Sequence, residues 1–255
     1  MSELNLEILK CVAFDLDGTI YFGSKQLAGW AQKVIDFLRN KFGRVCFITN
    51  NSALTRHQLY ERLCNLSILI DEDEVLNSSY LISRYLILNQ IKQVRCIGTD
   101  NLCQELKLNG IEPKSEHPEW IVIWYNPKFT LSDIEDVLKV YTPKCKIIIA
   151  NTERTYPRDN GVITPGAGAI SAAFMHTVNR TDGVILGKPN ILMLDMVAKL
   201  YNLSPEEILV IGDTYESDIQ MAEMYGSQSI LIRNGDVNDY FCNNVNELQD
   251  LLFIL

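Results

Sequence analysis

Two aspartates that directly follow an apolar segment are the residues of this sequence best suited to chemistry. Residues 11–14 are apolar and partly β-branched, which predicts a buried strand, and Asp15 and Asp17 come immediately after it. Gly18 allows a tight turn beside them. Because buried charges need partners, such a pair would stabilise a core poorly, whereas it can hold a hard cation and present a nucleophile. The alternative is an ordinary turn, in which Asp and Gly are common.

Polar residues also follow three further predicted strands. They are Thr49, Asn50, Asn51 and Ser52 after the strand 44–49, Lys188 after 184–187, and Asp213 with Asp218 after 208–212. The carboxyl ends of parallel strands lie at one edge of a sheet, so we expect these residues to gather beside Asp15 and Asp17. Each group alone has a simpler explanation: a helix N-cap, a solvated surface lysine, or an Asp turn. The specific signal is the order of the four groups, each after a strand.

Together these side chains favour phosphoryl transfer assisted by a divalent cation. Like charges at close range repel, so the carboxylates need a counter-charge, and oxygen ligands without histidine indicate Mg²⁺. A threonine hydroxyl, turn amides and a lysine can hold the oxygens of a phosphate group. One aspartate can attack phosphorus to give an aspartyl-phosphate. A second aspartate, two residues further on, can protonate the leaving alkoxide and then deprotonate the attacking water.

Alternating strands and helices must position these groups. The apolar pattern predicts core strands at 11–14, 44–49, 75–79, 184–187, 208–212 and 229–232, further strands at 94–98, 120–124 and 146–150, and helices between them, including one at 217–225. Such alternation implies parallel sheets. We therefore predict an α/β protein with a Rossmann-like parallel-sheet core at 1–80 and 183–255 and an inserted α/β cap domain at 81–182. The stretch 151–165 is expected to be a long loop.

The composition narrows the class of protein and its surroundings. The 255 residues carry a net charge of −9 and no basic run, so nothing predicts a nucleic-acid partner. No apolar run is long enough to predict a membrane span, and the acidic start is unlike a secretory signal. Seven scattered cysteines without a CxxC pair predict free thiols in a reducing compartment, which we take to be the cytoplasm. The three histidines share no motif and are expected at the surface.

The four polar groups resemble the four motifs of the haloacid-dehalogenase-like hydrolases, as DLDGT, TNNS, GKP and GDTYESD. Longer segments, including FITNNSALT and RTYPRDNGVITPGAGAI, are similar to the NagD-like branch, also called the p-nitrophenyl-phosphatase-like group. The resemblance covers nearly the whole chain. It implies that Asp15 is the nucleophile and that Asp17 is the general acid and base.

The resemblance also implies which residues bind metal and phosphate. Asp15, the carbonyl of Asp17 and Asp213 would ligate Mg²⁺, and Asp218 would support them through water or a neighbouring ligand. The phosphoryl group would be bound by Thr49, Asn50 and Lys188, with Asn51 as a further candidate. The insert would be the large cap domain of this branch, which closes over the core site and selects the substrate.

Substrate choice is predicted to lie in the loop 151–165 of the cap. Its side chains Glu153, Arg154, Tyr156 and Arg158 offer charge of both signs and an aromatic face, which suits a small polar metabolite. The alternative is an ordinary solvated hairpin loop. Two departures from the family pattern occur. Asn151-Thr152-Glu153 stands where relatives often have Asn-Pro-Asp, and Leu66-Ser67-Ile68 stands where they often have Leu-Gly-Ile. The first leaves the identity of the substrate open.

The sequence thus predicts a Mg²⁺-dependent phosphatase that hydrolyses small phosphorylated metabolites, either sugar phosphates or nucleotide-like monoesters. Two other functions stay open as alternatives. They are a phospho-receiver and an inactive scaffold that keeps the fold as a binding module. The inserted module and the order of the acidic residues speak against a receiver. A dead scaffold should have lost one of Asp15, Asp17, Lys188 or Asp213, and none is lost. We also leave open a homo-oligomer formed through the cap.

Overall fold

A computed structural model describes residues 4–23, 25–26, 30–157, 162–234 and 242–255 of the chain. The chain divides into two units. The first consists of Met1–Thr49, Leu59–Leu76 and Lys188–Leu255, and the second of Asn50–Gln58 and Asn77–Gly187. The second unit contains the whole of the predicted insert, 81–182, and also takes in the segment 50–58 that follows Thr49.

A six-stranded sheet forms the centre of the first unit. Its order is β14 (Asn244–Val245), β13 (Gln228–Ile232), β12 (Ile208–Gly212), β1 (Cys11–Phe14), β4 (Arg44–Thr49) and β5 (Val75–Asn77). β1 pairs in parallel with both β4 and β12, so the chain first builds one side of β1 and later returns to build the other. This order is that of a Rossmann-like fold, in which ligands bind beyond the strand ends where the direction of building reverses. The predicted fold class is confirmed.

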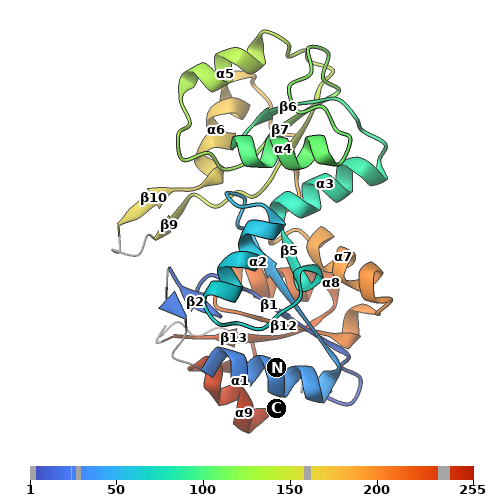
Figure 1. Cartoon of the computed structure of the whole chain (residues 1–255), viewed down its shortest axis with the longest axis vertical. Helices are drawn as coiled ribbons and strands as arrows, with labels where there is room; N and C mark the ends of the chain where they lie inside the picture. Colours follow the sequence, from blue (N-terminus) through green and yellow to red (C-terminus); the bar gives the residue numbers. More distant parts are fainter. Residues whose placement is uncertain (1–3, 24, 27–29, 158–161, 235–241) are drawn as a thin grey trace. The chain divides into compact units, whose positions relative to one another are not determined.

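Helices cover both faces of this sheet. The residues of α1 (Trp30–Phe42) that are buried, namely Ala31, Val34, Ile35, Leu38 and Phe42, are spaced as on one face of a helix. The short α9 (Leu251–Ile254) lies beside α1, whereas α7 (Leu192–Tyr201) and α8 (Gln220–Tyr225) lie together (Figure 1). Because crossovers between parallel strands are right-handed, α1 and α8 cover opposite faces. Two further elements follow core strands: the hairpin of β2 (Tyr21–Phe22) and β3 (Lys25–Gln26) after β1, and α2 (Arg56–Asn65) after β4.

The second unit has a parallel sheet of its own. Its order is β11 (Val184–Ile185), β8 (Lys146–Ile149), β7 (Trp120–Ile123) and β6 (Val94–Ile97). The helices are α3 (Ser78–Leu88), α4 (Asp100–Leu108), α5 (Leu131–Leu138) and α6 (Ala167–Thr177). Ile121, Ile123, Ile147 and Ile149 alternate along β7 and β8, and they share one apolar cluster with residues of α5 and α6. On the other face of β7, Trp120 packs edge-on against Tyr85 of α3.

One strand was assigned to the wrong sheet by the sequence. Residues 184–187 were expected to be a core strand that ends in Lys188. In the structure β11 pairs with β8 instead and completes the sheet of the second unit. Gly187 continues this pairing, since its N–H donates to the Ala150 carbonyl at 2.8 Å. Lys188 is therefore the first residue of the returning core segment and not the end of a core strand.

Three other element predictions were also wrong in part. The strand expected at 75–79 ends at Asn77, because the Asn77 side chain accepts a hydrogen bond from the Tyr80 N–H and caps α3. The loop expected at 151–165 contains an antiparallel hairpin of β9 (Thr155–Pro157) and β10 (Ile163–Pro165). The helix expected at 217–225 is a π-helical turn, Tyr215–Ile219, followed by α8.

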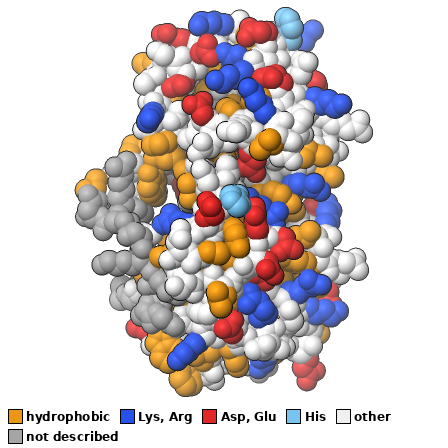
Figure 2. Space-filling view, viewed as in Figure 1, with side chains coloured by type: hydrophobic (Ala, Val, Ile, Leu, Met, Phe, Trp, Pro, Cys, Tyr) orange, Lys and Arg blue, Asp and Glu red, His pale blue; other side chains and the backbone are white. Residues whose placement is uncertain are grey.

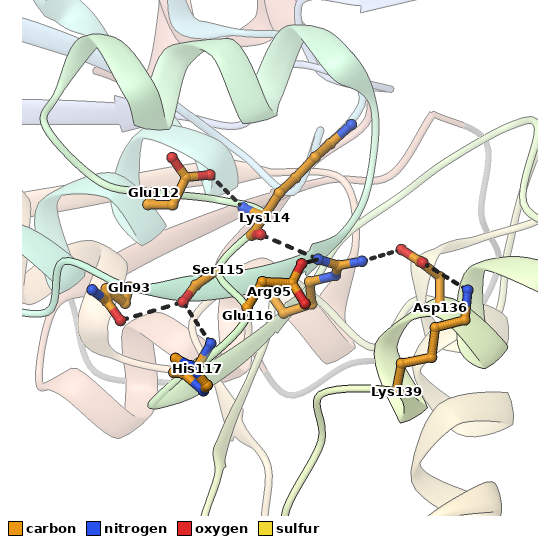
Figure 3. A network of polar contacts seen from close by, with 9 residues as sticks. All are labelled: Gln93, Arg95, Glu112, Lys114, Ser115, Glu116, His117, Asp136 and Lys139. Carbon is orange, nitrogen blue, oxygen red and sulfur yellow. Dashed lines mark hydrogen bonds and ion pairs between the residues drawn. The ribbon is translucent and has the colours of Figure 1, made fainter.

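A buried arginine closes the edge of the second sheet. Arg95 of the edge strand β6 forms ion pairs with Asp136 and Glu116 and donates to the Lys114 carbonyl (Figure 3). The segment around Lys114 also forms isolated bridges with Arg95 and Gln93. An uncovered edge strand invites pairing with other chains, so this network protects β6.

The surface carries charges of both signs. On the face shown in Figure 2, Lys and Arg side chains are interspersed with Asp and Glu. Among the described residues, no helix is both long and apolar enough to cross a membrane. All seven cysteines lie within the described chain and are free, as expected. The three histidines, His57, His117 and His176, are exposed, also as expected.

Candidate active site

Lys188 lies between two buried carboxylates of the first unit. Its Nζ donates to Asp15 Oδ1 at 2.5 Å and to Asp218 Oδ1 at 2.6 Å, and it lies 3.4 Å from the Ile48 carbonyl. All three charged side chains are at most 7 % exposed. Burial alone would lower the pKa of Lys188, but the two carboxylates outweigh it and raise that pKa. Lys188 is therefore a permanently charged group at the end of β1.

Asp15 keeps one oxygen without a protein partner. Its side chain is buried, and within the described chain nothing forms a hydrogen bond to Oδ2. Loss of hydration raises the pKa of Asp15 well above its usual value, although Lys188 acts in the opposite direction. A buried polar atom without a partner is costly. The structure therefore presents Asp15 Oδ2 as an atom that needs a cation or a substrate.

Three carboxylates are grouped closely enough to hold a metal ion. Oxygens of Asp15, Asp213 and Asp218 lie within 4.8 Å of one another. Loss of hydration, and next the charge of Asp218, raises the pKa of Asp213 to about 7, so ionising the whole group requires more positive charge than Lys188 supplies. The donors are carboxylate oxygens, and Asp15 has one oxygen, Oδ2, without a partner in the described chain. This set fits a hard divalent cation such as Mg²⁺.

The Asp17 side chain lies beside a threonine. Thr49 Oγ1 donates to Asp17 Oδ2 at 3.3 Å. Asp17 reaches the surface, yet the protein atoms around its carboxyl limit hydration and raise its pKa, an effect that the charge of Arg62 opposes. The Arg62 guanidinium lies 4.5 Å from the centre of the Tyr21 ring. Sequence reasoning missed Arg62 and Tyr21, which lie outside the motifs.

Local backbone geometry brings the acidic residues together. Gly18 has φ +97°, and a Cβ at this position would lie 2.1 Å from Asp213 Oδ2, so only glycine fits between β1 and β12. Asn234 Nδ2 holds the Gly18 carbonyl at 2.7 Å. Asp218 lies in the π-helical turn, where its Oδ2 accepts from the Thr214 N–H at 3.2 Å. The first unit thus contains six predicted site residues: Asp15, Asp17, Thr49, Lys188, Asp213 and Asp218.

The predicted phosphate residues Asn50 and Asn51 belong to the second unit. Asn51 Oδ1 accepts from the N–H groups of Ala53 and Leu54 and so forms a local turn. Asn50 Nδ2 donates to Glu153 Oε1 at 2.9 Å. Their roles in phosphate binding stay predictions, and so does the role of the Asp17 carbonyl in metal binding.

The cap residues predicted to set specificity have varied surroundings. Glu153 is exposed and bonded to Asn50, and Arg154 is exposed. The Tyr156 hydroxyl lies 2.6 Å from that of Tyr125, with the two rings edge to face. Arg158 lies outside the described residues. From the sequence, Asn151 was noted only as part of a departure from the family pattern. Asn151 directly follows the predicted strand 146–150, and a polar residue in that place indicates a candidate site residue.

Comparisons with known proteins assign the class. A family model described as haloacid dehalogenase-like hydrolase matches residues 12–112, and a second, HAD-hydrolase-like model matches residues 185–247. The sugar-phosphatase AraL of Bacillus subtilis is 30 % identical over 227 residues, which cover 88 % of this chain and 83 % of that protein. The chain belongs to the haloacid dehalogenase-like hydrolases.

Further relatives bear phosphatase names, and a solved structure shares the fold. The acid sugar phosphatase of Staphylococcus epidermidis is 29 % identical over 87 % of this chain and 85 % of its own. The structure of the p-nitrophenyl phosphatase from Archaeoglobus fulgidus matches with a TM-score of 0.88 at 24 % identity, over 97 % of this chain and 99 % of that one. The chain is thus a phosphoric monoester hydrolase with the NagD-like fold.

Proposed function

We propose that the protein is a Mg²⁺-dependent phosphatase that hydrolyses small phosphorylated metabolites through an aspartyl-phosphate on Asp15. The observation that carries this proposal is the setting of Asp15. Lys188 holds Oδ1, Oδ2 is buried without a partner in the described chain, and the carboxylates of Asp213 and Asp218 are close by. Asp15, Asp213 and Asp218 would hold Mg²⁺, which would supply positive charge to the phosphate oxygens and to the crowded carboxylates.

The reaction follows from the roles of the side chains. A carboxylate oxygen of Asp15 attacks phosphorus, and the bond from phosphorus to the ester oxygen breaks. Asp17 gives its proton to the departing alkoxide, which leaves as the alcohol. Asp17 then takes a proton from water, whose oxygen attacks the phosphorus of the aspartyl-phosphate and releases inorganic phosphate and the Asp15 carboxylate. Lys188 holds Asp15 in place and neutralises charge throughout.

The substrate class proposed is a sugar phosphate or a similar small monoester. Two of the relatives are named sugar phosphatases, and the Arabidopsis thaliana relative that is 26 % identical is named phosphoglycolate phosphatase 2. The second unit would act as the cap, with Arg154 and Tyr156 near the leaving group. The free thiols suit a reducing compartment, and we propose the cytoplasm.

A test compares the purified protein with Asp15→Asn on p-nitrophenyl phosphate and a panel of sugar phosphates, with Mg²⁺ or with a chelator. We expect Mg²⁺-dependent turnover by the wild type and a loss of at least about a thousandfold in Asp15→Asn, since the nucleophile is gone. Asp36→Asn on the exposed side of α1 is the control and should keep full activity. Substantial turnover by folded Asp15→Asn would contradict the proposal. A scaffold would show no turnover at all, and a receiver would stay phosphorylated.

A further inference from the structure

The loop that follows β8 holds the loop that follows β4. Both loops belong to the second unit. Asn151 is only 2 % exposed. Its Nδ2 donates to the Asn50 carbonyl at 2.7 Å and lies 3.4 Å from Ser52 Oγ, and its Oδ1 accepts from the Glu153 N–H at 3.2 Å. One buried side chain therefore ties three residues of two loops together.

The neighbouring groups leave the Asn50 side chain little freedom. Asn50 Nδ2 donates to Glu153 Oε1 at 2.9 Å. On the other side, a Cβ at Gly187 would lie 2.5 Å from Asn50 Oδ1 and 2.5 Å from the Ala150 carbonyl. Glycine is required at 187 because the backbone passes this close. The contacts thus fix which end of the Asn50 amide faces Glu153.

Holding the Asn50 carbonyl also orients the next amide. In a trans peptide the C=O and N–H groups lie in one plane and point in opposite directions. The hydrogen bond from Asn151 to the Asn50 carbonyl therefore directs the Asn51 N–H away from Asn151. This amide belongs to the turn that is proposed to hold phosphate oxygens.

We propose that Asn151 and Glu153 are positioning residues for phosphate recognition and act through the loop 50–52. This rests on the proposed function and on the prediction from the sequence that this loop binds the phosphoryl group. Asn151 orients the backbone of the loop, and Glu153 orients the Asn50 side chain. Because every substrate and the product carry the phosphoryl group, changes at these positions act on all of them equally. A residue that contacts the leaving group would instead alter the ranking of substrates.

The first test measures two quantities for Asn151→Ala in the full-length protein. These are kcat/KM for p-nitrophenyl phosphate and a sugar phosphate, and the dissociation constant of inorganic phosphate by calorimetry. Removing one well-formed hydrogen bond should weaken phosphate binding by about tenfold. The kcat/KM of both substrates should fall by a similar factor, so that their ratio is unchanged. Ser171→Ala is the control, because it removes a buried hydrogen bond to the Gly168 carbonyl in the same unit and should leave phosphate affinity unchanged.

The second test uses Glu153, because it is exposed and its substitution removes no buried side chain. Glu153→Gln keeps an acceptor for Asn50 and should retain phosphate affinity, whereas Glu153→Ala should lose it severalfold. This pair also decides the question if Asn151→Ala does not fold. A changed substrate ranking at constant phosphate affinity, or unchanged phosphate affinity in both Asn151→Ala and Glu153→Ala, would overturn the proposal. Absence of turnover in the wild type would overturn the proposed function alone, since phosphate binding still reports on positioning.

Discussion

Lys188 forms ion pairs with two buried carboxylates at once. It is the cation in contact with both Asp15 and Asp218, at 2.5 and 2.6 Å, and all three are buried. Charges in such a place are tolerated only when they are paired. The lysine is therefore a structural requirement of the first unit, in addition to the phosphate-binding role that we propose for it.

Replacing Lys188 by methionine should reveal this structural part. Methionine fills similar space but leaves two buried carboxylates without their cation, which should lower the free energy of unfolding by about 3–5 kcal/mol. Lys199→Met is the matched control, because Lys199 forms an exposed pair with Asp195 on α7 and should cost at most about 1 kcal/mol. Urea unfolding of both variants without added metal measures the difference. Equal losses of unfolding free energy in Lys188→Met and Lys199→Met would show that the buried ion pairs stabilise the protein no more than an exposed one does.

Among the elements, the end of α2 shows the structural effect of having Ser67 where relatives often have glycine. The Ser67 N–H donates to the Cys64 carbonyl and the Ile68 N–H to the Leu63 carbonyl at 3.0 Å, which is the hydrogen-bond pattern of a Schellman motif. Ser67 occupies the left-handed position of this motif with φ 61°. Glycine is usual there because a side chain is strained in that region. The change from Leu-Gly-Ile to Leu-Ser-Ile thus adds strain without altering the turn.

Ser67→Gly should therefore stabilise the protein. Relief of the strained φ should exceed the entropy cost of glycine, for a gain of about 0.5–1 kcal/mol in the free energy of unfolding. Ser132→Gly in α5, where the backbone is helical, should instead lose a few tenths of a kcal/mol. Thermal and urea unfolding give both values. A loss of stability in Ser67→Gly would show that the serine side chain contributes a contact larger than the strain.

Sequence patterns predicted the elements of the core well, for a physical reason. β1, β4 and β12 are buried strands whose ends carry Asp15, Thr49 and Asp213, and both apolar composition and position are local signals. The strand with which β11 pairs cannot be read from its own residues. β11 has only two residues, both half-buried, and such a short strand can extend either sheet. The contact between Asn151 and Asn50 likewise joins residues that are distant in sequence. Pairing across long separations is what the sequence does not show.

For the molecule as a whole, a bound metal ion should stabilise the folded state of the first unit. A ligand that binds only the folded state adds about 2.7 kcal/mol at a concentration one hundred times its Kd. Added Mg²⁺ should therefore raise Tm, and Asp213→Asn should remove most of that shift because it takes one carboxylate from the group. Hydrogen exchange should slow in β1 and β12 more than in β7, which lies in the second unit. Chelation that changes neither Tm nor activity would contradict the metal site.

One unit of the molecule carries the residues proposed for the phosphate chemistry, and the other is an α/β unit built around its own sheet. The first unit contains the proposed nucleophile Asp15, the acidic group and Lys188, all at one sheet edge and its adjoining turns. The second supplies the loops 50–52 and 151–153, joined by Asn151. In the proposed reaction, the first step forms a covalent bond between Asp15 and phosphorus, and the second step breaks it.

Trapping that bond is the most direct test of the proposed mechanism. The protein is mixed with excess p-nitrophenyl phosphate and Mg²⁺, quenched in acid during turnover, reduced with borohydride and digested for peptide mass spectrometry. An aspartyl-phosphate at Asp15 predicts reduction of that residue to homoserine in the peptide containing 11–19, with Asp17 unmodified and no such product without substrate. Turnover with an unmodified Asp15, or with the modification on another residue, would contradict the central claim.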